Sequence, residues 1–87
     1  MLKSKFFRSL EKRFGPFDLD ACADDEGLNA HLSVFCSPKN SFLDFDASGC
    51  KVFMNPPYGR ARKFLKHYFD CKEKYPKRTP GVFVLPE

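Results

Sequence analysis

The sequence predicts an α/β fold with a parallel sheet, and three observations support that prediction. Apolar runs typical of buried strands occupy residues 51–54 and 81–85. A helical pattern of apolar residues lies between them, and a second one opens the chain at residues 2–14. A strand, a helix and another strand in this order predict a right-handed crossover between two parallel strands.

The first helix is predicted from Phe6, Leu10 and Phe14, which recur at helical spacing, and Gly15-Pro16 ends it. Cations near its C-terminal end suit the helix dipole. Residues 17–21 then alternate apolar and acidic side chains, which is typical of a short strand ending in carboxylates.

The middle of the chain carries weaker signals. Residues 28–32 are compatible with a short helix and residues 34–36 with an extended segment, and turn-forming runs surround both. The second long helix is expected over residues 60–75. The chain stops directly after the strand at 81–85, and three short strands leave unprotected sheet edges. We therefore expect residues 1–87 to form a single domain that is part of a larger α/β domain.

The net charge of +4 is unevenly distributed along the 87 residues. Residues 1–15 carry five Lys and Arg against one acid, and residues 60–79 carry eight against two. Residues 16–59 carry two Lys against seven acids. An acidic middle between basic flanks suits a cationic cofactor beside a polyanionic substrate such as DNA. The alternative is that both basic segments are simply the solvated faces of helices.

Composition narrows the class of protein. No run approaches the roughly 20 apolar residues of a membrane span, and the N-terminus lacks the apolar core of a secretory signal. The four cysteines form no CxxC pair and no close His pair accompanies them, so no metal site is expected. We expect an intracellular, soluble protein whose cysteines are free buried thiols rather than a disulfide pair.

The tetrapeptide Asn55-Pro56-Pro57-Tyr58 is the most informative motif, because it follows directly after the strand at 51–54. Two prolines cannot continue a sheet and fix a rigid, extended turn. Ligands bind at the carboxyl ends of strands in open α/β sheets, so this turn is the predicted catalytic site. The alternative is a structural turn in which Asn55 caps and Tyr58 packs.

This turn suits methylation of an exocyclic amine such as that of adenine. The nitrogen lone pair is delocalised into the ring, and two acceptors aimed at its hydrogens would localise it. The Asn55 side-chain carbonyl and the Pro56 main-chain carbonyl are the candidate acceptors, placed where positive charge develops. Tyr58 would stack on the ring, which in duplex DNA must first be flipped out.

A second candidate site is the end of the first strand, from Asp18 through Asp20 and Ala21 to Cys22. Its acidic groups would meet the ribose hydroxyls or the amino-acid part of a cofactor. A solvated acidic edge is the alternative. His31 and His67 are weaker candidates, as a turn residue and a phosphate neighbour respectively.

With these residues in hand, the sequence resembles the phage-type DNA adenine-N6 methyltransferases, which use S-adenosylmethionine. Three stretches carry the resemblance: Asp18-Leu19-Asp20-Ala21-Cys22-Ala23 with Asn29-Ala30, Val52 to Gly59 around the tetrapeptide, and Val82 to Pro86. The resemblance implies a partial Rossmann-like methyltransferase sheet with flanking helices. It also implies that Asn55, Pro56, Pro57 and Tyr58 form the adenine site.

The resemblance further implies that the turn from Asp20 to Cys22 lies at the methyl donor. In related enzymes an acidic residue before a Phe-Leu pair contacts the adenine ring of the donor, and here Ser41 precedes Phe42. Ser41 and Phe42 are therefore candidate cofactor contacts. The candidate DNA contacts lie at the start of the second helix: Arg60, Arg62, Lys63 and Lys66.

Two other functions remain open on the sequence. One is a catalytically inactive, nucleic-acid-binding fragment of such a domain, which the basic segments favour. The other is an amino-methyltransferase acting on a non-DNA substrate, because the same acceptors serve any planar amine. The sequence leaves the recognition sequence and the oligomeric state undetermined.

Overall fold

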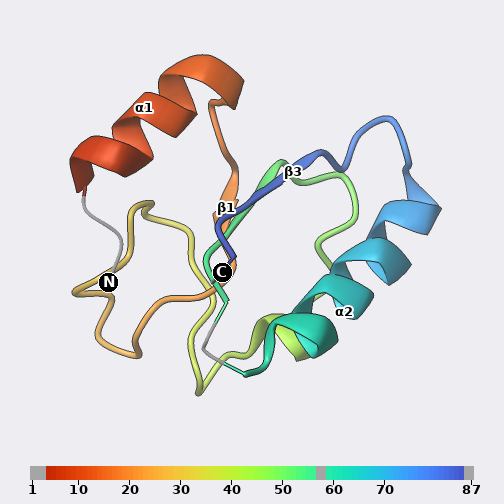
Figure 1. Cartoon of the computed structure of the whole chain (residues 1–87). Helices are drawn as coiled ribbons and strands as arrows, with labels where there is room; N and C mark the ends of the chain where they lie inside the picture. The colour runs from red at the N-terminus through yellow and green to blue at the C-terminus, as the bar shows by residue number, and fades with distance from the viewer. Residues whose placement is uncertain (1–3, 57–58, 86–87) are drawn as a thin grey trace.

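The computed structural model describes residues 4–56 and 59–85 and folds them into a small parallel sheet with a long helix on each face (Figure 1). The elements in chain order are α1 (Ser4–Phe14), β1 (Leu19–Asp20), the 3-10 turn η1 (Phe42–Asp44), β2 (Val52–Met54), α2 (Ala61–Lys74) and β3 (Gly81–Phe83). The predicted α/β class and its order of helices and strands agree with this arrangement.

The sheet has the order β1-β2-β3, and both pairs of strands are parallel. On the edge of β1 that faces away from β2, Asp20 forms a parallel bridge with Phe35. The chain therefore leaves β1 toward one edge of the sheet and returns to β2 on the other side. Such a reversal of direction opens a crevice at the carboxyl ends of the two strands, where open α/β sheets bind ligands.

The central strand β2 is buried on both faces, which explains why its sequence is a continuous apolar run. Its side chains alternate between two cores. Phe53 packs edge-on against Phe7 of α1, with ring centroids 4.8 Å apart. Val52 and Met54 belong to the opposite core, together with the inner face of α2.

The helix α1 ends where glycine is required. The Gly15 amide donates to the Glu11 carbonyl oxygen at 2.7 Å. A Cβ at Gly15 would lie 2.5 Å from that same oxygen, so a larger residue cannot pass here without displacing the turn. The predicted stop at Gly15-Pro16 is therefore confirmed.

The structure corrects three details. Residues 28–32 form turns and bends instead of a short helix, because an Asp24–Asn29 pair of hydrogen bonds closes the segment into a loop. Of residues 17–21, Leu19–Asp20 alone are strand. β3 ends at Phe83 and is half-buried rather than fully buried, because it lies at the edge of the described sheet.

Candidate functional site

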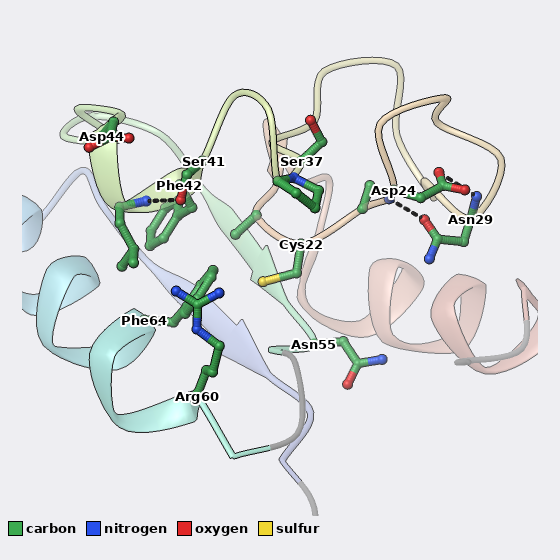
Figure 2. Close-up of a pocket in the computed structure, with 14 residues that line it drawn as sticks. Cys22, Asp24, Asn29, Ser37, Ser41, Phe42, Asp44, Asn55, Arg60 and Phe64 are labelled. Atoms are coloured by element: carbon green, nitrogen blue, oxygen red, sulfur yellow. Dashed lines mark hydrogen bonds between the residues drawn. The ribbon is translucent and has the colours of Figure 1, made fainter.

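A cavity of about 560 Å³ opens at the carboxyl ends of β1 and β2. Its walls come from segments far apart in the sequence: the loop after β1, the segment leading into η1, Asn55 after β2, and the start of α2 (Figure 2). The volume lies within the range of roughly 300–1,000 Å³ for sites that hold small molecules. The cavity therefore lies where the reversal of chain direction predicts a ligand.

Asn55 follows the last residue of β2 and lines the cavity. Pro56 is buried behind it and is not part of the lining. Gly59 has a φ of 80° and redirects the chain toward α2. Pro57 and Tyr58, the other two residues of the predicted catalytic turn, lie outside the described residues. The structure thus places Asn55 at the cavity and leaves the rest of the adenine site a prediction.

The loop after β1 reaches the cavity through Ala21 and Cys22, two of the predicted cofactor residues. The carboxylates of Asp18 and Asp20 do not line it. Asp18 is exposed and accepts a hydrogen bond from the Lys51 amide at 2.8 Å. The structure therefore separates the four predicted residues of this strand end into two that line the cavity and two that do not.

Asp20 instead holds the loop from inside. Its side chain is 1% exposed, and its two oxygens accept from the backbone amides of Cys22, at 3.2 Å, and His31, at 2.9 Å. The His31 ring stacks on Phe7 of α1, with ring centroids 4.6 Å apart. Asp20 thus connects the cavity wall to the core beneath α1.

Burial also sets the protonation states in this loop. Burial raises the pKa of the Asp20 carboxyl, and the two amide hydrogen bonds partly oppose that rise. Burial, with the neighbouring Asp20 and Cys36, raises the pKa of the Cys22 thiol to about 12, while the charge of Arg60 acts in the opposite direction. Cys22 is therefore a neutral wall residue at neutral pH, and all four cysteines are free thiols.

Asp24 and Asn29 form a reciprocal bracket in the cavity wall, visible as the dashed lines at the right of Figure 2. The Asp24 amide donates to Asn29 Oδ1 at 2.7 Å, and the Asn29 amide donates to Asp24 Oδ1 at 3.3 Å. Sequence reasoning did not identify Asp24 as a site residue and used Asn29 mainly as part of the resemblance. The signal was present, because two Asx residues flank Gly27, whose φ is 73°.

Ser41 and Phe42, the remaining predicted cofactor residues, both line the cavity. The Ser41 hydroxyl accepts from the Leu43 amide at 3.1 Å and so caps η1. The Phe42 ring is nearly parallel to Phe64 of α2, with centroids 6.1 Å apart and an interplanar angle of 13°. These contacts fix an aromatic wall opposite the loop after β1.

The predicted DNA contacts divide into two groups. Arg60 lines the cavity. Arg62, Lys63 and Lys66 are exposed on α2 and do not line it. Lys66 also pairs with Asp70 one turn along the helix, at 3.2 Å.

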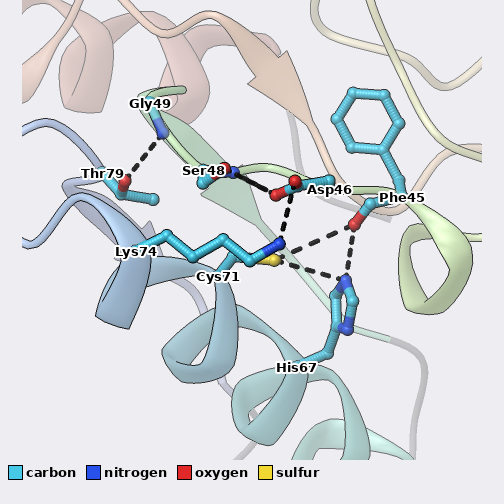
Figure 3. A network of polar contacts seen from close by, with 8 residues as sticks. All are labelled: Phe45, Asp46, Ser48, Gly49, His67, Cys71, Lys74 and Thr79. Atoms are coloured by element: carbon cyan, nitrogen blue, oxygen red, sulfur yellow. Dashed lines mark hydrogen bonds and ion pairs between the residues drawn. The ribbon is translucent and has the colours of Figure 1, made fainter.

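A smaller cavity of about 230 Å³ lies between α2 and the segment after η1. Here His67 Nε2 lies 2.6 Å from the Phe45 carbonyl oxygen, Cys71 Sγ lies 3.4 Å from the same nitrogen, and Lys74 pairs with Asp46 (Figure 3). A nitrogen that donates to a carbonyl cannot accept a proton from Cys71, so this pair is not an activated thiol. The contacts fasten η1 to α2.

Two further searches bear on the class of site. Across residues 4–56 and 59–85, no group of three or more His, Cys, Asp or Glu side chains is arranged to hold a metal ion. Within the same residues, no helix is both long enough and apolar enough to span a bilayer.

Comparison with curated proteins and with solved structures found no match. A family model does match, over residues 3–84 of the 87, and its description is DNA N-6-adenine-methyltransferase (Dam). The match includes both ends of the cavity, from the loop after β1 to the turn after β2, and it confirms the resemblance drawn from the sequence. The chain belongs to the DNA N-6-adenine-methyltransferase (Dam) family.

Proposed function

We propose that the chain transfers a methyl group from S-adenosylmethionine to the exocyclic amine of adenine at specific sites in DNA. One observation carries the proposal: the cavity at the carboxyl ends of β1 and β2 joins Asn55 to the loop after β1. In a chain of this family, those two segments would hold the target amine and the methyl donor respectively. Methyl transfer needs both within reach of each other, and one cavity satisfies that requirement.

Asn55 and Pro56 would act by electrostatic preorganisation. The Asn55 side-chain carbonyl and the Pro56 main-chain carbonyl would accept from the two hydrogens of the adenine amine. Both dipoles then stabilise the positive charge that the nitrogen gains. Tyr58 would stack on the flipped base, and Pro57 would keep the turn stiff. No side chain needs to act as a general base in this scheme.

The charges of the cavity suit the proposed donor. S-adenosylmethionine carries a sulfonium, an ammonium and a carboxylate, and its sulfonium supplies an electrophilic methyl group. Among the described lining residues, Asp24, Asp44 and Arg60 are charged, which gives two anions and one cation. Ala21, Cys22 and the Phe42 wall supply neutral surface for the remainder. The donor set on the protein therefore complements the donor molecule in sign and number.

DNA would approach across α2. Arg62, Lys63 and Lys66 are exposed on the first turns of this helix, close in sequence to the turn that holds the base. Lysine and arginine on such a face neutralise phosphates and release counterions, which gives affinity without reading the sequence.

The test is transfer of an isotopically labelled methyl group to adenine-containing duplex DNA, read as N6-methyladenine by mass spectrometry. The whole 87-residue chain is expected to produce labelled N6-methyladenine, and Asn55→Ala to produce it at least about 10²-fold more slowly, the usual cost of one preorganised contact. Asn40→Ala is the matched control, because Asn40 is exposed and does not line the cavity. Equal label from the parent chain and Asn55→Ala would refute the proposal.

A nucleic-acid-binding role without catalysis is the second candidate, and the exposed cations of α2 favour it. It predicts salt-sensitive DNA binding with no affinity for S-adenosylmethionine. Isothermal titration calorimetry separates the two functions, because saturable donor binding contradicts a purely DNA-binding role.

A further inference from the structure

Arg60 differs from the other basic residues around the site. In the part of the chain that the structure describes, it is the cationic side chain that lines the large cavity, whereas Arg62 and Lys63 belong to the outer surface of α2. Figure 2 shows its side chain rising from the start of α2 into the space between Cys22 and the Phe42–Phe64 wall. Its position is therefore that of a ligand contact inside the cavity rather than of a surface charge.

Three contacts define that position. The guanidinium carbon lies 5.7 Å from the centroid of the Phe64 ring, within the range of a cation–π interaction. Phe64 is buried and stacks on Phe42, so the surface beneath the guanidinium is fixed. On the other side, the charge of Arg60 acts on the Cys22 thiol and opposes the rise in its pKa.

The start of α2 adds positive potential at the same place. Arg60 is the residue immediately before the helix, and no side chain caps the helix at this end. Uncapped amides and the helix dipole both favour an anion there. A guanidinium also presents a planar fork of donors that matches a carboxylate in two parallel hydrogen bonds.

We infer that Arg60 binds the carboxylate of the amino-acid part of the methyl donor and so sets the specificity of the cavity for a donor that carries this group. The inference rests on the proposed function. The reacting methyl group must lie at Asn55, and the carboxylate is attached to the same sulfur through a short carbon chain. The anion of the donor must therefore lie close to Asn55, and Arg60 supplies the cation at that end of the cavity.

This assignment moves Arg60 from the predicted DNA contacts to the donor site. Its guanidinium faces the cavity shared by the loop after β1 and Asn55, while Arg62, Lys63 and Lys66 remain on the outer face of α2. A DNA phosphate is the competing anion, because it offers the same pair of oxygens to a guanidinium. The experiment below distinguishes the two sources.

The test compares S-adenosylmethionine with decarboxylated S-adenosylmethionine, which lacks the carboxylate alone. Calorimetry is expected to show that Arg60→Gln weakens binding of the complete donor by about 10–100-fold, the range for a hydrogen bond to a charged group. Its affinity for the decarboxylated donor should equal that of the parent chain. Arg60→Lys should fall between, since it keeps the charge and loses the fork.

Two controls accompany these measurements. Arg78→Gln removes an exposed arginine outside the cavity and should leave the affinity for both donors unchanged. Far-ultraviolet circular dichroism and the urea midpoint should be the same for Arg60→Gln as for the parent chain, because the Arg60 side chain is exposed.

Three outcomes would overturn the inference. Equal weakening of both donors by Arg60→Gln would mean a general disturbance of the cavity. Unchanged donor affinity with weakened DNA binding would identify the anion as a DNA phosphate. If the parent chain binds neither donor, the proposed function fails and this inference fails with it. Parent-chain methylation that is insensitive to Arg60 overturns the inference and leaves the proposed function standing.

Discussion

At the scale of single residues, Asp20 shows how a buried charge can serve a site without touching a ligand. Both of its oxygens accept backbone amides, from Cys22 at the cavity wall and from His31 beneath α1. The loop between these two residues carries Asp24 and Asn29. Asp20 therefore determines where that loop stands, and the geometry of the cavity follows from it.

Replacing Asp20 should cost stability as well as shape. Asp20→Ala leaves two largely buried amides without an acceptor, at about 1–3 kcal/mol each, so the free energy of unfolding should fall by about 2–4 kcal/mol. Asp20→Asn keeps one acceptor and should fall by less. Urea unfolding followed by circular dichroism measures both changes.

Asp18→Ala is the matched control for this measurement. Its carboxylate also accepts a backbone amide, from Lys51, but it is exposed, and water can replace it there. Losses of the same size for Asp18→Ala and Asp20→Ala would contradict the account of the buried acceptor.

Residue-level prediction from the sequence succeeded where a residue follows directly from a strand end. Asn55, Ala21 and Cys22 line one cavity because the carboxyl ends of neighbouring parallel strands meet at one edge of a sheet. The direction of the Asp20 side chain was not predictable in the same way. It depends on the distant His31 amide, and the sequence carries no sign of that contact.

At the scale of elements, α2 separates two tasks by its faces. Phe64, Tyr68 and Cys71 are buried against the sheet, and the Tyr68 hydroxyl donates to the Thr79 carbonyl at 2.6 Å. The opposite face carries the exposed cations. Because the helix begins directly after the turn that follows β2, this face lies next to the entrance of the proposed base site.

The outer face of α2 should therefore control the salt dependence of DNA binding. Replacing Arg62, Lys63 and Lys66 together by Gln should lower the slope of log affinity against log salt by up to about 2–3, at about 0.9 for each phosphate contact. Donor affinity should not change. Fluorescence anisotropy with labelled duplex DNA at several salt concentrations measures the slope.

The control for this slope is Lys77→Gln with Arg78→Gln, which removes exposed cations from the turn after α2. That variant should keep the slope of the parent chain within about one contact. The assignment of the interface to α2 is wrong if both variants lose the same amount.

Prediction of elements from the sequence followed the strength of the periodic pattern. The two long helices and the β2 run were recoverable because apolar spacing alone defines them. The segment 28–32 was not, because side-chain hydrogen bonds between Asp24 and Asn29 override a weak helical preference. β3 is shorter than its apolar run because strand pairing on one side does not extend past Phe83.

At the scale of the whole molecule, β2 joins two cores that are otherwise separate. Phe53 points into the core under α1, while Val52 and Met54 point into the core under α2. Asn55 is the next residue, so the position of the proposed acceptor depends on both cores at once. The cavity is thus a property of the complete arrangement, and no single element contains it.

The α/β class, the parallel pairing and the family were accessible from the sequence, since they rest on patterns and on a motif. The reversal of chain direction at β1 was not, because it depends on the bridge between Asp20 and Phe35. That bridge places the loop after β1 beside the turn after β2. The full set of cavity residues could be collected only with it in place.

The most direct test of the central claim is a ¹⁵N-resolved NMR titration of the 87-residue chain with S-adenosylhomocysteine, at concentrations up to about 1 mM, the upper range of enzyme substrate constants. If the cavity between β1 and β2 holds the donor, the largest shift changes should fall on the amides of 21–24, 41–43 and Asn55. No shift changes, or changes concentrated around His67 and Lys74 at the smaller cavity, would contradict the account.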